Sequence, residues 1–507
     1  MRSGNHSIPH RAAIFAAALT ASVTAACFAA APATSQPAAT QPTAAQLEAE
    51  IQALQNQVKA LQSGQQNVQR SEESAAEVRQ IVKQVLSDAK TRSEYMGNAL
   101  QAGYNNGFFI QSANKEFNLT INGYLQYRYT WSQAQRGNNV TATGSPIPSS
   151  DLGNSNGFDA RRARLILSGY AFKNIIYSIS GDFASGSGLG NSFQILDTWV
   201  GYEFNPGLMI RAGSMLVPFT HVEYYSSGTE FPEFAAAEAP FDPVRSLALD
   251  VSGNVDNNKL FYDAQINNGS KANGLDGSAN VSATPNIDNR MGFYARVQYA
   301  GAGTNSDFTD SPDVSWHKHL VWAIGAAAGY EEQNSSAGVY PAPQTSLALA
   351  GLATPNAGFL PGVAASGSLY RATVDGHLKY RGLALNGAIY YQQYNAATPG
   401  AGNDTALLYK TYGTGSVWQL GAYGEAGYFI VPHRWELAAR IGDLTTDGQG
   451  KQSMEYTAGV NYYIFGENAK IQTAFTYLPN AAYSSPNVGS NANTQDFITQ
   501  VELQVKF

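Results

Sequence analysis

Residues 494–507 (TQDFITQVELQVKF) alternate between apolar and polar side chains and end on an aromatic residue. From Phe497 onward the odd positions are apolar or threonine and the even positions are polar, with Ile498 as the exception. Successive side chains of a strand point to opposite faces, so this strand has one apolar and one hydrated face. A soluble sandwich also uses such strands, but they do not all repeat the pattern at membrane-spanning length.

The same alternation recurs along the chain from Phe117 onward. The predicted strands are residues 117–131, 162–172, 175–184, 194–204, 208–215, 246–253, 259–267, 290–299, 319–331, 369–380, 383–395, 417–430, 434–441, 454–464, 470–478 and 494–507. An even count of about 16, with segments approaching about 9–11 residues, is what a closed bacterial transmembrane barrel requires. We therefore expect an all-β transmembrane barrel of antiparallel strands over residues 117–507.

Short and long connections alternate between these strands. The long ones, rich in Gly, Asn, Ser and Ala, include residues 132–157, 269–289, 332–368 and 479–493. Outer-membrane barrels have short periplasmic turns and long external loops, so both ends of the barrel chain are expected in the periplasm. Residues 301–318 are an exception, because this topology places a long connection on the periplasmic side. We interpret the terminal Phe507 as the signal that the barrel-assembly machinery reads.

The composition favours one large β unit. The 507 residues include 49 Gly, 29 Tyr and 23 Phe, and only 14% are charged. Beyond the amino terminus there is no run of about 18 apolar residues, so no transmembrane helix is expected in the mature chain. The formal net charge of -7 makes nucleic acid an unsuitable partner.

Residues 1–33 are predicted to be a secretory signal peptide, because Arg2 and Arg11 precede an Ala-rich apolar stretch. The single cysteine, Cys27, lies within it. A lipoprotein cleavage box usually has leucine three places before the cysteine, where this chain has Thr24, so lipidation is disfavoured. Without Cys27 the exported protein has no thiol for a disulfide or a Cys-based metal site, and we expect neither a metal nor a cofactor.

A heptad-like seam follows the Pro/Ala/Thr-rich linker, residues 34–46. The seam residues are Leu47, Ile51, Leu54, Val58 and Leu61. Their spacing predicts a helical segment over residues 47–95 that associates into a periplasmic coiled coil. The sequence leaves open whether two or three helices associate. The alternative is a single amphipathic helix that lies on the barrel. Residues 96–116 then form a connector to the barrel.

Strand parity also predicts which side chains face the lumen. In residues 369–380, Tyr370 and Tyr380 fall on the lipid face at the two ends, where aromatic girdles lie. The lumen-facing basic residues are Arg128, Arg162, Arg164, Arg211, Arg296, Arg371, Lys379 and Arg440. Inward carboxylates such as Asp182 and Asp250 accompany them. For each arginine, a structural salt bridge and a role in ion selectivity are both open.

The third external loop, residues 216–244, is aromatic and acidic. Its candidate constriction residues are His221, Glu223, Glu230, Glu233, Glu238 and Asp242. If the loop folds into the barrel, its carboxylates would face wall arginines across the constriction and create a transverse field that orients dipolar solutes. The alternative is that these carboxylates decorate an exposed loop.

Several stretches of the chain resemble the phosphate-selective porin O/P family. They are GFFIQSANKEFNLTINGYLQYRY (107–129), RRARLILSGYAF (161–172) and DTWVGYEFNPGLMIRAGSMLVPF (197–219), followed by SSGTEFPE (226–233). The resemblance implies a homotrimeric outer-membrane channel in which basic residues draw anions inward. The chain departs from the family at residues 215–217, where members tend to carry a basic residue. Phosphate capture requires clustered donors, and the arginines here are scattered.

We therefore expect an outer-membrane porin of a Gram-negative-type bacterium, embedded in outer-membrane lipid. It would pass small hydrophilic solutes and ions by diffusion, with anion preference left open. The alternative function is a structural tether in which the coiled coil holds the cell wall. An enzyme is not expected, because the one Gly-x-Ser-x-Gly match, residues 153–157, lies in a polar loop without a strand before it.

Overall fold

The computed structural model divides the chain into two units, residues 1–94 and 95–507. It describes residues 48, 51–59, 80, 83–84, 100–135, 154–184, 193–225, 227–269, 291–333, 353–354, 357–359, 367–396, 416–446, 453–481 and 495–507. In these ranges no helix is long and apolar enough to span a bilayer.

Residues 51–59 of the first unit are helical. Ile51, Leu54 and Val58 are 53%, 58% and 52% exposed on this helix. Leu47 and Leu61 lie outside the described residues, so the coiled-coil association stays a prediction.

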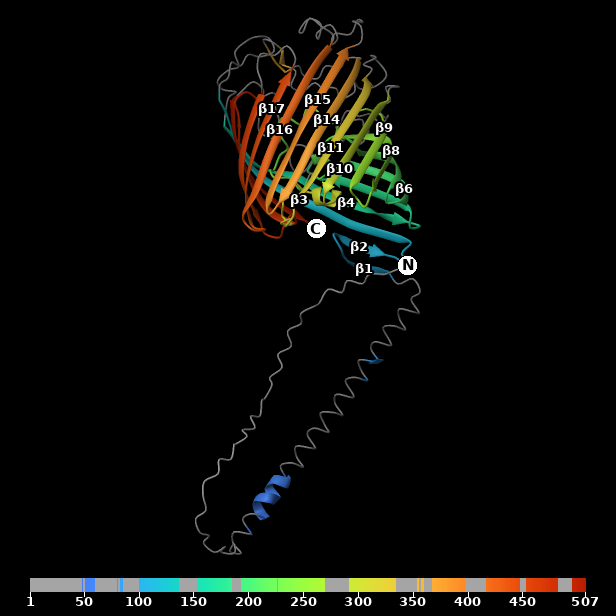
Figure 1. The fold of residues 1–507 in the computed structure, drawn as a ribbon, viewed down its shortest axis with the longest axis vertical. Coiled ribbons are helices and arrows are strands. Elements are labelled where there is room, and N and C mark those ends of the chain that lie inside the picture. The colour runs from blue at the N-terminus through green and yellow to red at the C-terminus, as the bar shows by residue number, and fades with distance from the viewer. Residues whose placement is uncertain are drawn as a thin grey trace, which may run out of the picture. The chain divides into compact units, whose positions relative to one another are not determined.

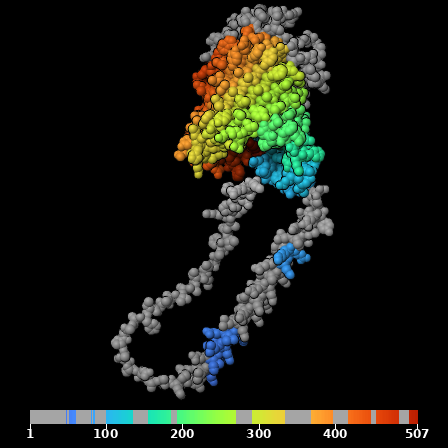
Figure 2. All heavy atoms as spheres, turned by 45° about the vertical axis from the view of Figure 1, so that its right-hand side comes forward, coloured from blue at the N-terminus to red at the C-terminus, as the bar shows by residue number. Residues whose placement is uncertain are grey.

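The second unit is a closed antiparallel barrel (Figure 1). Figure 2 shows the outer face of its wall with all atoms drawn. Its sheet has 18 strands, and all except the hairpin strands β1 and β2 form the closed wall. The wall strands are β3 (Phe117–Gln135), β4 (Asn154–Ala171), β5 (Ile175–Asp182), β6 (Gln194–Asn205), β7 (Leu208–Leu216), β8 (Arg245–Val255), β9 (Leu260–Asn267), β10 (Gly292–Ala302), β11 (Val321–Gln333), β14 (Gly367–Tyr380), β15 (Leu383–Ala396), β16 (Ser416–Val431), β17 (Trp435–Thr446), β18 (Ser453–Tyr463), β19 (Ala469–Leu478) and β20 (Gln495–Lys506). A separate two-stranded sheet joins β12 (Ala353–Thr354) to β13 (Ala357–Phe359).

The barrel closes where β20 pairs with β3. The register runs from Gln495 opposite Gln135 to Lys506 opposite Tyr124. The terminal residue continues the ladder, because the Phe507 amide donates to the Gly123 carbonyl at 2.9 Å. Closure leaves no strand edge in hydrocarbon, where each unpaired backbone group costs several kcal/mol. The predicted closed barrel is confirmed.

The closure depends on a glycine. A Cβ at Gly123 would lie 2.6 Å from the Arg164 carbonyl and 2.8 Å from the Phe507 ring. We expect Gly123→Val to destabilise the barrel by about 1–3 kcal/mol through overpacking. The measurement is the temperature at which the heat-modifiable band shifts on a gel. Gly376→Val is the control, since a Cβ there meets nothing within 4 Å, and an equal shift in both variants would contradict the role of Gly123.

The two faces of the wall follow strand parity. On β20, Val501 and Leu503 are 41% and 44% exposed on the outer face, while Glu502 and Gln504 are fully buried inside. The exception in the sequence pattern, Ile498, faces inward and packs with Leu478 and Ala481. A small apolar cluster inside the barrel therefore accounts for the break in alternation.

The long connection between β10 and β11 lies on the side of the short turns. It contains the 3-10 helix η1 (Asn305–Phe308). The Asn305 amide donates to Asn258 in the β8–β9 turn at 2.8 Å, and the Arg381 amide in the β14–β15 turn donates to the His317 carbonyl at 2.8 Å. The structure thus places this connection, called the periplasmic loop below (residues 303–320), where the strand order predicted it.

The connector before the barrel carries a hairpin that the sequence analysis did not predict. Strands β1 (Gln101–Tyr104) and β2 (Phe108–Gln111) pair with each other, and Phe108 lies opposite Ile121 of β3. Since β20 ends opposite Tyr124, β2 occupies the place beside β3 that β20 leaves open. The hairpin extends the wall at the rim nearest to the amino terminus of β3 (Figure 1).

Candidate functional site

The third loop, L3 (residues 217–244), lies inside the barrel. The rings of Phe219, Phe231 and Phe241 are 0%, 1% and 0% exposed. Phe241 stacks on Tyr390 of β15, with ring centroids 5.5 Å apart. Burial of these aromatic side chains favours the folded-in position, at about 25 cal/mol per Å² of apolar surface. The alternative of an exposed loop is therefore wrong for the described part of L3.

Inward polar side chains hold the backbone of L3. Lys470 and Gln472 of β19 donate to the Thr229 carbonyl at 3.0 and 2.7 Å. Arg440 donates to the Glu233 carbonyl at 3.0 Å. A buried loop must find partners for its backbone groups, and the wall supplies them here.

Glu233 connects L3 to the opposite wall through two arginines. Its carboxylate accepts hydrogen bonds from Arg128 of β3 and Arg161 of β4. Arg161 reaches inward because the β3–β4 register shifts at Gln126, so that a β-bulge interrupts the alternation. Burial alone would raise the pKa of Glu233, but Arg161 and Arg128 lower it to about 2.

This contact predicts a defined pH response. A carboxyl whose folded pKa is depressed stabilises the folded state above its ordinary pKa of 4.5 and loses that contribution as the pH falls toward 2. We expect channel conductance to be constant from pH 7 to about 5, and current noise to rise below about pH 4 as L3 loosens. The measurement is single-channel recording against pH. In Glu233→Gln the added noise should be present already at pH 7, and noise that is identical in both proteins at every pH would contradict the assignment.

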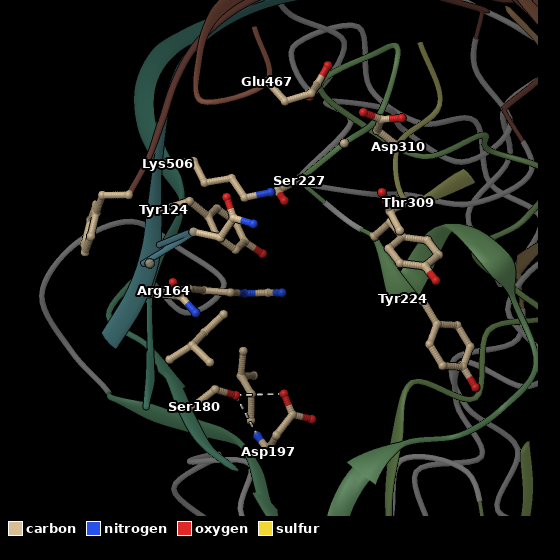
Figure 3. A pocket seen from close by; sticks show the side chains of 18 of the residues that line it. Tyr124, Arg164, Ser180, Asp197, Tyr224, Ser227, Thr309, Asp310, Glu467 and Lys506 are labelled. Atoms are coloured by element: carbon tan, nitrogen blue, oxygen red, sulfur yellow. Dashed lines mark hydrogen bonds between the residues drawn. The ribbon is translucent and has the colours of Figure 1, made fainter. Parts of the chain in front are cut away.

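A cavity of about 550 Å³ lies between L3 and the wall formed by the first and last strands. Figure 3 shows Arg164 and Lys506 pointing into it from one side and Tyr224 lying on the other. Tyr224 belongs to α2 (His221–Tyr224), a short helix of L3. Asp310 of the periplasmic loop and Glu467 of the β18–β19 turn line the same cavity.

Most charges around this cavity are paired. Arg164 bonds Asp182 at 2.9 Å, and Arg245 bonds Asp197 at 2.9 Å. Asp310 and Glu467 pair with Lys379 and Lys470. Two lining groups differ: the Lys506 ammonium and the Glu223 carboxylate make no hydrogen bond or ion pair with any residue the structure describes.

The eight predicted basic residues all lie on inward faces, in two kinds of surroundings. Arg164 lines the 550 Å³ cavity, and Arg296 lines a second cavity of about 220 Å³ that shares Tyr224 and Tyr225 with the first. The other six do not line either cavity, and their ion pairs or hydrogen bonds go to neighbouring groups: Arg128–Asp159, Arg162–Gln126, Arg211–Asp250, Arg371–Tyr294, Lys379–Asp310 and Arg440–Glu455. That all eight line the passage stays a prediction, because parity gives only the direction of a side chain.

The candidate constriction residues of L3 also lie in two kinds of surroundings, at the cavity or buried. Glu223 lines the larger cavity, whereas Glu230, Glu233, Glu238 and Asp242 are 0%, 7%, 1% and 8% exposed. Most of the acidic side chains thus pack against the wall or within L3 and do not face it across water. A transverse field between these carboxylates and the wall arginines stays a prediction.

His221 stacks on His377 of β14, with ring centroids 3.9 Å apart. Burial and the neighbouring His377 lower the pKa of His221 well below its ordinary value, so its side chain is neutral. His221 therefore adds no positive charge to the acidic loop L3.

Sequence reasoning missed Arg161, Lys506 and the carboxylate of Asp310 as components of the lumen. For Arg161 a signal existed, because two consecutive arginines in a strand would leave one in lipid unless a bulge turns it inward. Lys506 already lay on the hydrated face of the last strand. Asp310 had no signal, since it enters from a connection expected to lie outside the barrel.

A closed transmembrane barrel with a polar, charge-lined cavity defines the protein class as an outer-membrane channel. The sequence profile of the family "Phosphate-selective porin O and P" matches residues 134–507. The chain belongs to this family. It is accordingly an outer-membrane porin for diffusion of solutes, and the family and fold point to a channel and not to an enzyme.

Solved porin structures resemble the chain only distantly. The anion-selective porin from Comamonas acidovorans shares 12% identity over 77% of this chain and 100% of its own, with a TM-score of 0.47. The channel DcaP of Acinetobacter baumannii shares 10% identity over 80% of this chain and 100% of its own, with a TM-score of 0.46. The trimer form of OmpT from Vibrio cholerae shares 8% identity over 77% of this chain and 99% of its own, with a TM-score of 0.45. No curated protein sequence matches the chain significantly. The family assignment rests on the profile match.

Proposed function

We propose that solutes cross the barrel through the 550 Å³ cavity beside L3, with weak selection by charge. The observation that supports this is the pairing of the lining charges, which leaves Lys506 and Glu223 as one free cation and one free anion among the described lining residues. Balanced charges produce no strong net potential. They do produce a field across the passage, which orients dipolar solutes and water.

Strong phosphate selectivity does not follow from this arrangement. A phosphate dianion needs several donors converging on one point to replace its hydration. Arg164 and Arg245 are each committed to a carboxylate at 2.9 Å. We therefore propose passive diffusion of small hydrophilic solutes, with at most a modest anion preference.

The test is the reversal potential in a planar bilayer under a KCl gradient, followed by liposome swelling with neutral, zwitterionic and phosphate solutes. We expect a chloride-to-potassium permeability ratio within about fivefold of unity, because one partly screened charge contributes about 1 kcal/mol. A ratio far above this, or uptake of phosphate much faster than that of neutral solutes of equal size, would contradict the proposal.

We further propose that the protein is a homotrimer and that the amino-terminal helix lies in the periplasm and associates there. The exposed Ile51, Leu54 and Val58 support this, because they recur at heptad spacing on a helix. Mass measurement of the detergent-solubilised protein should give three chains. Leu54→Asp should weaken assembly while the barrel remains folded, and an unchanged mass and stability would oppose the role of the helix.

Export by a signal peptide and recognition of Phe507 by the barrel-assembly machinery belong to the same proposal. The backbone bonds between Phe507 and Gly123 in the β20–β3 seam support this role of the chain terminus. Binding of the helix to the cell wall stays a prediction. A cell-wall pull-down with and without residues 34–95 tests it.

A further inference from the structure

Outside the lining of the 550 Å³ cavity, two buried carboxylates converge on one point. Glu230 of L3 and Glu436 of β17 are both fully buried. An ideal Cβ at Gly427 would lie 2.7 Å from Glu230 Oε2 and 2.6 Å from Glu436 Oε1. Both carboxylates thus occupy the space that the absent side chain of Gly427 leaves free.

Three of the four oxygens of these carboxylates lack a donor. Both oxygens of Glu230 and Oε1 of Glu436 have no hydrogen-bond partner in the described part of the chain. The Lys470 ammonium, which donates to the Thr229 carbonyl next to Glu230 at 3.0 Å, is paired with Glu467 at 2.8 Å. A buried charge without a partner costs several kcal/mol, so this pair requires a counter-charge or a proton.

Two buried amide side chains that donate to the backbone of residues 229–230 each have an unpartnered oxygen. Asn461 Nδ2 donates to Glu436 Oε2 at 3.0 Å and to the Glu230 carbonyl at 2.8 Å, which fixes the amide orientation. Asn461 Oδ1 is left without a donor, as is Gln472 Oε1, whose Nε2 donates to Thr229. Asn461 lies opposite Glu436 in the β17–β18 register.

A shared proton would relieve the repulsion between the carboxylates but would leave the amide oxygens without partners. A hard divalent cation satisfies both, because Ca²⁺ takes six to eight oxygen ligands from carboxylates, amides, backbone carbonyls and water with flexible geometry. No three His, Cys, Asp or Glu side chains of the described residues form a metal cluster. The amide and carbonyl oxygens are therefore needed to complete the coordination.

We propose that Glu230 and Glu436 bind a Ca²⁺ ion that fastens L3 to the inner wall, with Asn461 and Gln472 as the neighbouring oxygen donors. The ion would neutralise two buried carboxylates and hold the loop segment at residues 229–230 in place. This site is separate from the passage. Its occupancy would set how firmly L3 is held, and not which solute passes.

The test uses the full-length protein, purified in detergent, stripped with EGTA and titrated with Ca²⁺ by calorimetry. Tb³⁺ serves as a luminescent probe, because Tyr463 donates to Glu436 at 2.6 Å and is placed to sensitise it. We expect one ion per chain, a higher unfolding temperature with Ca²⁺, and at least about tenfold weaker binding in Glu230→Gln and in Glu436→Gln. Asp256→Asn, at an exposed position in the β8–β9 turn, is the control and should bind as the wild type does.

Absence of Ca²⁺ and Tb³⁺ binding would overturn the proposal and leave the shared proton as the arrangement. Equal binding by wild type and both glutamine variants would overturn it as well, since the ion would then sit elsewhere. Calorimetry and luminescence do not depend on conduction. A failure here is therefore distinguishable from a failure of the proposed passage, which is measured by bilayer currents.

Discussion

Replacing residues 220–241 of L3 with a short Gly-Ser linker will raise the single-channel conductance by about twofold or more, because conductance follows the open cross-section of a pore. The replaced segment fills part of the lumen with buried side chains, among them Phe231 and Phe241 at 1% and 0% exposure. Their removal leaves an inner wall of polar and charged residues, which water can hydrate.

The barrel itself should survive this replacement, since its closure depends on backbone pairing between β20 and β3 and not on L3. Circular dichroism and heat-modifiable mobility establish that the shortened protein is folded. Unchanged conductance in a folded barrel would show that L3 does not limit the passage.

The second large effect is expected at Lys506. Lys506→Glu places a second negative charge in a passage that already contains the unpaired Glu223. Each charge contributes about 1 kcal/mol at about 4 Å in a water-like dielectric, so this reversal should shift the permeability ratio toward cations by at least about fivefold. Glu223→Lys should shift it toward anions. The reversal potential under a KCl gradient measures both shifts.

The double variant, Lys506→Glu with Glu223→Lys, should return the ratio close to that of the wild type, because the free charges balance again. Lys115→Glu makes the same charge change at an exposed position between β2 and β3 and serves as the control. If Lys115→Glu moves the reversal potential as much as Lys506→Glu does, the selectivity arises from overall surface charge. The assignment of Lys506 to the passage would then fail.

The strand pattern could be predicted because alternation between lipid and water is imposed on each strand separately. Parity placed Arg128, Arg162 and Arg164 on the inner face, where the structure has them. It failed at Arg161, where a bulge changes the alternation, and it could not explain Ile498, whose apolar partners lie in other segments. Such departures depend on neighbours across the sheet, which a single strand does not specify.

The interior of the site was harder to predict, since its contacts join distant parts of the chain. Glu233 meets Arg128, and the Thr229 carbonyl meets Lys470. Nothing local to the acidic loop distinguishes Glu223, which lines the cavity, from Glu230, which is buried behind it. The loop composition indicated an interior role, but only the path of its backbone determines which carboxylate meets solvent.

The central claim is that the cavity beside L3 is the conducting path. Thiol modification tests it most directly in a Cys27→Ser background, with Ser227→Cys lining the cavity and Thr198→Cys exposed on the outer face of β6. Adding a charged methanethiosulfonate reagent during bilayer recording should reduce the current through Ser227→Cys and leave Thr198→Cys unchanged. A current through Ser227→Cys that is unaffected although mass spectrometry shows complete modification would contradict the account.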